Sequence, residues 1–342
     1  MLASWPVLRG FFPASFVVLT ACMDDTSAEE DGPACAALVE DPTPAVVPVS
    51  AAPLALDVGP FTKVLDVPGR YVNDHGFYPK DGRWHLHGIY DVQPRPSTRE
   101  ETDFVHATVT EMDPALWTTG TFTVAPPPAD IALSARPDLG ETHLWAPHVV
   151  ANGGESVMFF HVGLTGGAAG MASARSTDLV AWDRSPVAPL FTDVCVARDP
   201  MVTKVDGRWI MYYTRCNDPC IGRSAVAYRT SDDLVTWSEP SIALDLSWSR
   251  TMGNSGFTES PFVFHRGEYW YLSVTAYPIE WVATFLFRSR SPFQFDDVPV
   301  ARITAHAAEW IAKNGDLEHE PLFVSHCGPG QEGVYVAPVD GL

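Results

Sequence analysis

The chain has 342 residues, of which 46% are hydrophobic and 19% are charged, a composition typical of a globular protein. Its 42 acidic residues outnumber the 22 basic residues, and the formal net charge is -20. Because nucleic-acid backbones are bound by clustered lysines and arginines, this balance argues against a nucleic-acid partner. The 30 prolines and 25 glycines favour a protein of many short strands and turns.

The first 22 residues are typical of an export signal. Arg9 precedes an apolar run at residues 11–19, which is too short to cross a bilayer but has the length of a signal-peptide core. The run ends in Leu19-Thr20-Ala21-Cys22, which resembles the lipobox of bacterial lipoproteins. We therefore expect an exported cell-envelope lipoprotein with a lipid on Cys22. An ordinary signal peptide, with secretion of the protein, is the alternative.

Residues 23–50 are predicted to be a tether. They are rich in Asp, Glu, Ser, Ala and Pro, and they include the acidic run from Asp24 to Asp31. Such segments cannot bury enough apolar surface to fold. The pattern changes to strands after residue 50, so we expect a single folded domain at residues 51–342.

Removal of Cys22 to the lipid anchor leaves five cysteines in an oxidising compartment. Cys216 and Cys220 are close enough in sequence to pair across a loop. A metal site is less favoured there, because no second cysteine pair and no suitably spaced histidine pair follows. The pairing of the other three cysteines is left open.

A hairpin pattern recurs along the folded part of the chain. Each copy has a short head, an inner strand, a turn and a return strand rich in aromatic and β-branched residues. The heads are at His75, Pro147, Pro200 and Pro261, and the return strands are at Trp84–Tyr90, Ser156–Val162, Trp209–Thr214 and Tyr269–Val274. A fifth head is expected at Ala305–Ile311, with its return strand at Leu322–Cys327.

A second element of the repeat has the pattern Ser-x-Asp-Leu-Val-x-Trp, at residues 176–182 and 231–237. A repeat of this size with about four strands per unit is the signature of a β-propeller. Five units fit the chain, so the predicted fold is all-β, a five-bladed β-propeller. The strand at Leu54–Leu56 or Thr62–Leu65 is expected to join Gly333–Ala337 in the last blade, which would protect open sheet edges.

Three of the heads carry an acid, namely Asp74, Asp199 and Glu259. The first strand of each propeller blade lines the central channel, so these three carboxyl groups should converge at one end of it. Converging carboxylates raise each other's pKa, which favours a functional use of the coupling. Glycoside hydrolysis needs such a pair, one group protonated and the other ionised.

The same segments resemble motifs of the five-bladed propeller furanosidases of glycoside hydrolase families 43 and 32. Four segments carry the resemblance, which covers about residues 60–342: Asn73-Asp74-His75-Gly76, Leu144-Trp145-Ala146-Pro147-His148-Val149, Arg198-Asp199-Pro200 and Glu259-Ser260-Pro261. The first departs from the usual form, which has proline where His75 stands. No β-sandwich follows the propeller, as it does in family 32, so the resemblance is nearer to a family 43 single domain.

This resemblance implies roles for the site residues. Asp74 would be the nucleophile or general base, Glu259 the general acid, and Asp199 the group that orients substrate and tunes the acid's pKa. His306 lies where related propellers can hold a histidine near an axial metal ion, although a plain channel histidine is favoured. No cofactor is therefore expected, apart from a structural axial metal as an open option. The candidate substrate-binding residues are Asn73, Trp145, His148 and Arg198.

The predicted function is hydrolysis of O-glycosidic bonds in furanoside-type or related glycans of arabino, xylo or fructo configuration. The partner would be an oligo- or polysaccharide, with membrane contact only through the N-terminal lipid. A carbohydrate-binding propeller without catalysis is the alternative, because the first motif is imperfect. A transferase or phosphorylase on the same fold is a third option, and the oligomeric state is left open.

Overall fold

The computed structural model describes residues 52–92, 101–184, 189–193, 196–218, 223–250, 258–276, 283–327 and 333–342. The predicted signal peptide, the tether, the lipidation site Cys22 and the loop cysteine Cys220 lie outside these residues.

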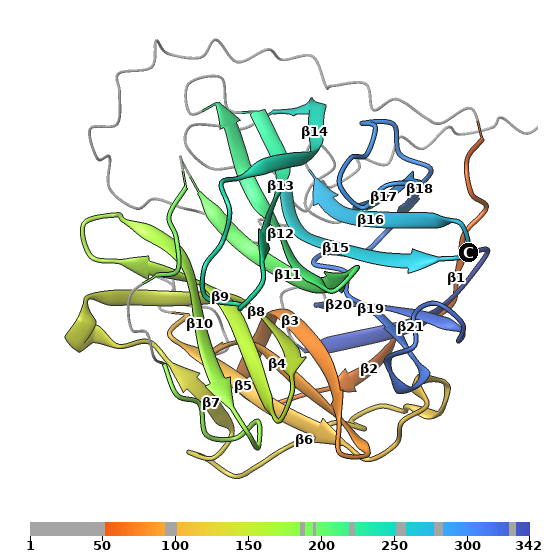
Figure 1. Ribbon diagram of the computed structural model, residues 1–342. Helices are drawn as coiled ribbons and strands as arrows, with labels where there is room; N and C mark the ends of the chain where they lie inside the picture. The colour runs from red at the N-terminus through yellow and green to blue at the C-terminus, as the bar shows by residue number, and fades with distance from the viewer. Residues whose placement is uncertain are drawn as a thin grey trace, which may run out of the picture.

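The described strands form five antiparallel sheets arranged around a common centre (Figure 1). The first sheet contains β3 (Arg70–Lys80), β4 (Arg83–Val92), β5 (Asp103–Val109), β6 (Thr123–Val124) and β7 (Ile131–Ser134). The second contains β8 (Glu141–Asn152), β9 (Glu155–Leu164) and β10 (Ala169–Ser176). The third contains β11 (Ala197–Val205), β12 (Arg208–Asp218), β13 (Arg223–Ser231) and β14 (Ser241–Arg250).

The fourth sheet contains β15 (Thr258–Arg266), β16 (Tyr269–Ala276), β17 (Thr284–Ser289) and β18 (Ala301–Ile303). The fifth contains β19 (Trp310–Ala312), β20 (Leu322–Cys327), β21 (Val334–Asp340), β1 (Asp57–Val58) and β2 (Thr62–Leu65). Between neighbouring sheets, β3 contacts β8, β8 contacts β11, β11 contacts β15, and β20 contacts β3. The chain is thus a five-bladed β-propeller, as the repeat predicted.

The two ends of the described chain close the ring. Strands β1 and β2 both pair with β21, with Val58 opposite Val339 and Thr62 opposite Val336. The C-terminus lies beside β1 in Figure 1. This pairing satisfies the backbone groups of strands that would otherwise be open edges, and it confirms the predicted shared last blade.

Helical structure is limited to three short 3-10 turns among the described residues: η1 (Pro114–Leu116), η2 (Pro137–Leu139) and η3 (Lys313–Gly315). In this part of the chain, no helix is long and apolar enough to cross a membrane.

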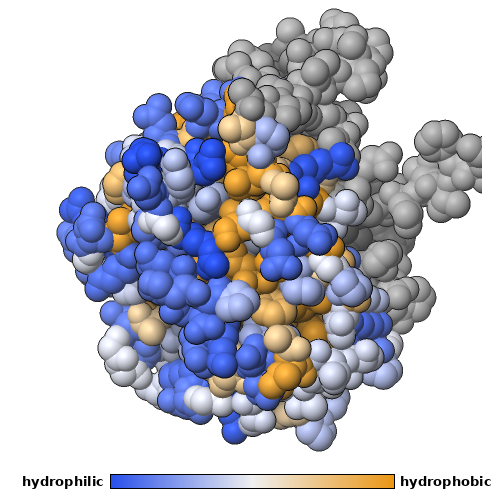
Figure 2. All heavy atoms as spheres, turned by 90° about the vertical axis from the view of Figure 1, so that its right-hand side faces the viewer, coloured by the Kyte–Doolittle hydropathy of each residue, from blue (hydrophilic) through white to orange (hydrophobic). Residues whose placement is uncertain are grey.

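The return strands are buried on both faces. In β9, residues Val157 to Phe160 are all 0% exposed. Met158 and Phe160 pack against the first blade, and Val157 and Phe159 pack against the third blade. A strand buried on both faces reads as a continuous apolar run. Hydrophobic residues also reach the surface, where Figure 2 shows an apolar band between polar areas.

Tight turns join the inner and return strands. Asp81-Gly82 and Asp206-Gly207 have φ values of 51°, 74°, 49° and 84°. Positive φ at both central residues is what a type I′ hairpin requires, and Asp-Gly is favoured there. The twist of this turn matches that of the strands it joins, so both hairpins keep a fixed register.

The Ser-x-Asp element forms the same turn in two blades. Leu179 N donates to Ser176 Oγ at 2.8 Å, and Leu234 N donates to Ser231 Oγ at 2.9 Å. The two leucines have φ values of 63° and 64°. The local hydrogen bonds hold this left-handed leucine in place, which explains why the motif recurs.

A bulge interrupts each of the first four inner strands. The register shifts between Val72 and His75, and at the corresponding places in β8, β11 and β15. The first paired residues after the four bulges are His75, His148, Met201 and Phe262. His75 therefore corresponds to His148, and not to Pro147, Pro200 and Pro261 as predicted. The predicted alignment of the first head is wrong by one residue. Asp74 takes the place of the prolines inside the bulge.

Candidate active site

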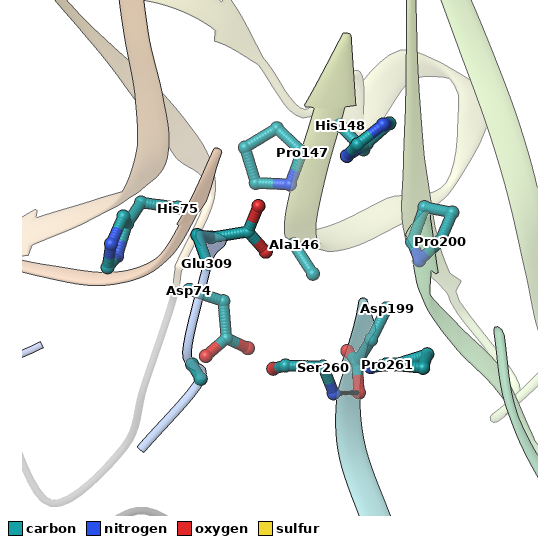
Figure 3. Close-up of a pocket in the computed structure, with 11 residues that line it drawn as sticks. Asp74, His75, Ala146, Pro147, His148, Asp199, Pro200, Ser260, Pro261 and Glu309 are labelled. Carbon is teal, nitrogen blue, oxygen red and sulfur yellow. Dashed lines mark hydrogen bonds between the residues drawn. The ribbon is translucent and has the colours of Figure 1, made fainter. Parts of the chain in front are cut away.

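The bulges of the inner strands surround a shared pocket with an empty volume of about 280 Å³. Every blade contributes to its wall, and Figure 3 shows the side chains around a shared space. The lining residues are Asp74, His75, Ala146, Pro147, His148, Asp199, Pro200, Ser260, Pro261, Ala307 and Glu309.

A left-handed residue shapes the wall in four blades. Ala146, Asp199, Ser260 and Ala307 have φ values of 50°, 55°, 51° and 49°. Non-glycine residues rarely adopt this region, and such strain accumulates at functional sites. In the first three of these blades the next residue is proline, whose ring faces the pocket (Figure 3).

Arg198 lies between two of the predicted catalytic acids. Its Nη2 is 3.3 Å from Glu259 Oε1, and its Nε is 3.5 Å from Asp199 Oδ2. Nη2 also donates to the carbonyl oxygen of Thr258 at 3.3 Å. Arg198 is 3% exposed, so this cation balances buried negative charge and belongs to the site.

Asp199 is held by donors from two blades. Its Oδ2 accepts hydrogen bonds from Ser260 N at 3.2 Å and from Thr214 Oγ1 at 3.3 Å. Burial raises the pKa of Asp199, while the Arg198 guanidinium and the two donors act in the opposite direction. These contacts fix the orientation of the carboxyl group.

His306 brings the other two acids together. Its Nε2 is 3.8 Å from Asp74 Oδ1 and 3.6 Å from Glu259 Oε2. All three side chains are largely buried, with exposed fractions of 8%, 13% and 5%. Asp74, Asp199 and Glu259, predicted from three separate motifs, therefore lie close together. Asp74 and Asp199 line the pocket, whereas Glu259 is outside the set that lines it.

His75 has a structural contact that accounts for its place in the first motif. Its Nε2 is hydrogen-bonded to Ser325 Oγ at 2.8 Å, which ties β3 to β20 of the neighbouring blade. Burial lowers the pKa of His75 to about 3, so the ring is neutral at pH 7. A buried, bonded imidazole can stand where the families have proline without adding charge beside Asp74.

Gly76 allows two blades to come close. A Cβ atom at this position would lie 2.8 Å from the carbonyl oxygen of Pro147. The absence of a side chain thus lets β3 approach β8 directly behind the pocket wall. The glycine of the first motif is explained by this contact.

The predicted substrate-binding residues lie in different surroundings. His148 lines the pocket, its Nε2–H donates to Val202 O at 3.0 Å, and burial lowers its pKa to about 4. Trp145 is stacked on His143 at 4.0 Å and on His161 at 4.9 Å, outside the set that lines the pocket. Asn73 is 6% exposed, and its Oδ1 accepts from Cys327 Sγ at 3.4 Å. The binding roles of these three residues stay predictions.

One pocket residue was missed by the sequence reasoning. Glu309 comes from the fifth head and places a third carboxyl group in the wall, with those of Asp74 and Asp199, and it points into the same space as Asp74 (Figure 3). Burial raises its pKa well above the usual range, and the negative charge of Asp74 adds to the effect. An acid at the head of the fifth repeat was the signal that could have identified it.

No metal centre is assigned in the described part of the chain. That part contains no group of three or more His, Cys, Asp and Glu side chains that could hold one. His306, the weak metal candidate, instead faces the two carboxyl groups of Asp74 and Glu259. We therefore assign no step to a metal.

Solved structures share the fold. The GH43_1 enzyme from Xanthomonas citri complexed with xylose has a TM-score of 0.60 at 15% identity, over 82% of this chain and 90% of that chain. A GH32 β-fructofuranosidase from Bombyx mori has a TM-score of 0.57 at 16% identity, over 82% of this chain and 61% of that chain. A family 117 glycoside hydrolase from Zobellia galactanivorans has a TM-score of 0.58 at 12% identity, over 84% and 91%.

No protein-family model matches the sequence, and no curated protein sequence matches it either. At such low identities the likeness to solved structures concerns the fold alone. The chain has the five-bladed β-propeller fold of glycoside hydrolases of families 43 and 32, which its motifs predicted, and of family 117.

Proposed function

We propose that this protein is a glycoside hydrolase that cleaves O-glycosidic bonds of arabino-, xylo- or fructo-configured glycans. The observation that carries the proposal is the position of His306 Nε2, 3.8 Å from Asp74 Oδ1 and 3.6 Å from Glu259 Oε2. Both carboxyl groups lie within 4 Å of the same nitrogen, so they are close to each other, and glycoside hydrolysis needs two carboxyl groups beside the scissile bond. Two proteins of the same fold, a GH43_1 enzyme complexed with xylose and a GH32 β-fructofuranosidase, support the same class of substrate.

In the proposed reaction, ionised Asp74 attacks the anomeric carbon or removes a proton from the attacking water. Protonated Glu259 donates its proton to the leaving oxygen as the glycosidic C–O bond breaks. Water supplies the hydroxyl group of the new reducing end. The products are two sugars. If Asp74 is the base, it releases the proton it took from water to solvent and Glu259 takes one up from solvent; if Asp74 is the nucleophile, Glu259 regains its proton from the water that hydrolyses the glycosyl–Asp74 ester.

The charges around Arg198 are compatible with a protonated Glu259. One guanidinium lies against two carboxyl groups, those of Asp199 and Glu259, and balances only one negative charge. A proton on Glu259 leaves Arg198 paired with Asp199. Asp199 therefore acts as the group that keeps the acid protonated.

The test is hydrolysis of aryl α-L-arabinofuranosides and aryl β-D-xylosides by the wild type and by Glu259→Gln. Glutamine keeps an oxygen for Arg198 but has no acidic proton. We expect kcat to fall by at least ~100-fold, with an unchanged circular dichroism spectrum. A wild type that cleaves no member of a broad glycoside panel, yet binds one tightly, would favour the carbohydrate-binding propeller instead.

We further propose that the full chain is exported and held at the cell envelope by a lipid on Cys22. The Leu-Thr-Ala-Cys sequence supports this. In a bacterial host, the full chain should partition with membranes, and Cys22→Ala should move it to the soluble fraction. Equal partitioning of both forms would contradict lipidation.

A further inference from the structure

The proposed reaction uses three carboxyl groups and leaves Glu309 without a role. Glu309 comes directly before β19 and lines the pocket with Asp74. Figure 3 shows both carboxyl groups reaching into the space between the blades. A sugar ring bound beside Asp74 would therefore meet Glu309 as well.

The backbone around Glu309 is fixed. Ser325 N donates to the carbonyl oxygen of Glu309 at 2.9 Å, and Trp310 Nε1 donates to Ser273 Oγ at 2.9 Å. Ala307, two residues before Glu309, has the left-handed φ of 49° seen at the other pocket heads. Because these contacts hold the start of β19, the Glu309 side chain enters the pocket from a rigid strand end.

The other titratable residues that line the pocket with Glu309 are acidic or neutral. Asp74 and Asp199 contribute carboxyl groups, and burial lowers the pKa values of His75 and His148 to about 3 and about 4, so both rings are neutral at pH 7. The described residues that line the pocket include no lysine or arginine. An ionised Glu309 would add negative charge beside Asp74, and both burial and that charge raise its pKa.

We infer that Glu309 is a specificity-determining residue, whose uncharged carboxyl group hydrogen-bonds a ring hydroxyl of the sugar unit held beside Asp74. A neutral carboxyl group donates one O–H and accepts through its other oxygen. A sugar hydroxyl also donates and accepts, so the two groups are complementary. This inference rests on the proposed function, because it names a contact of the same site with the same substrate class.

The first experiment compares the kinetics of Glu309→Gln, Glu309→Ala and the exposed control Glu318→Gln. Glutamine can donate and accept but differs in geometry, so we expect KM to rise about threefold. Alanine should raise KM at least about tenfold, with kcat changing much less. Glu318→Gln should match the wild type. A loss in Glu309→Gln of more than about 100-fold in kcat, smaller for substrates with good leaving groups, would instead make Glu309 the general acid and overturn the inference.

A second experiment measures binding without turnover, which separates the two proposals. Titration calorimetry with xylose, arabinose and their monodeoxy analogues gives the affinity of each sugar. We expect one deoxy analogue to bind the wild type at least about tenfold more weakly than its parent sugar, and Glu309→Ala to lose that discrimination. If the wild type binds sugars but cleaves none, the proposed function fails. The comparison of parent and deoxy sugars in the wild type and in Glu309→Ala still decides the role of Glu309. Equal discrimination in both proteins, or no sugar binding at all, overturns the inference.

Discussion

The Arg198 guanidinium and the Glu259 carboxyl group form a buried contact between two blades, with Nη2 3.3 Å from Oε1 and exposed side-chain fractions of 4% and 5%. Arg198 is on β11 and Glu259 is on β15, so the pair joins the third blade to the fourth, and each residue directly precedes one that lines the pocket. The same guanidinium lies 3.5 Å from Asp199. One cation thus contacts both the proposed general acid, Glu259, and the carboxyl group of Asp199.

Removal of this cation should destabilise the protein strongly. Arg198→Met would leave the carboxyl groups of Asp199 and Glu259 buried without their shared cation, and such losses cost about 3–5 kcal/mol. The free energy of unfolding, measured by urea denaturation at pH 7, is the readout. The matched control is Arg208→Ala, which breaks an exposed pair with Asp232 and should cost no more than about 1 kcal/mol. Equal losses in the two variants would contradict a buried charge role for Arg198.

The close approach of two blades at Gly76 gives a second prediction. In Gly76→Ala, the new Cβ would lie 2.8 Å from Pro147 O, so β3 or β8 must move. We expect a loss of about 1–3 kcal/mol in unfolding free energy. Activity should fall as well under conditions where the variant is folded, because Asp74 is two residues away on β3. Gly154→Ala is the control, since its Cβ would meet no atom within 4 Å. A Gly76→Ala variant as stable and active as this control would show that the approach is not tight.

The sequence predicted the architecture well because its signals are local. The Asp-Gly turns, the return strands and the Ser-x-Asp turns each depend on residues a few positions apart. They repeat often enough to number the blades. The three acids were proposed for the same reason, since each lies in a recognisable strand head.

The contacts within the site were less predictable, because they join residues from different blades. His306 lies between acids of the first and fourth blades, which no local pattern indicates. Glu309 was missed because its head lacks the proline that marks Ala146, Asp199 and Ser260, although Ala307 has the same left-handed backbone. The one-residue error at His75 arose because the bulge residues were aligned by motif rather than by strand pairing.

The buried histidine of the first motif predicts acid sensitivity. The pKa of His75 is lowered to about 3, below the ordinary value of 6.5, mainly by burial. Between pH 3 and pH 6.5, His75 therefore binds a proton in the unfolded protein but not in the folded protein. Stability is complete above pH 6.5 and falls as the pH drops toward 3, by up to about 1.4 kcal/mol per pH unit for this group.

His75→Gln should reduce this dependence. We expect the difference in unfolding free energy between pH 7.5 and pH 4.5 to be smaller in His75→Gln than in the wild type, by about 1–3 kcal/mol. Urea denaturation at the two pH values is the measurement. His319→Gln, which changes an exposed histidine, is the control. An unchanged pH dependence in His75→Gln would mean that folding does not lower the pKa of the imidazole.

Asp199 provides a test of its proposed role as the group that tunes Glu259. Asn tolerates the left-handed backbone at this position, where φ is 55°, and its amide oxygen can still accept from Ser260 N and Thr214 Oγ1. Asp199→Asn should therefore fold but lose one negative charge near the general acid. Without that charge, Arg198 is free to pair with Glu259 alone, which favours ionised Glu259 and lowers its pKa.

The expected result of Asp199→Asn is a shift of the alkaline limb of the kcat–pH profile toward lower pH, by about one unit. Thr214→Val is the matched control, because it removes one hydrogen bond to Asp199 and keeps the charge. Its alkaline limb should stay closer to that of the wild type. If Asp199→Asn lowers kcat equally at every pH, Asp199 positions the substrate or Arg198 without setting the protonation of Glu259.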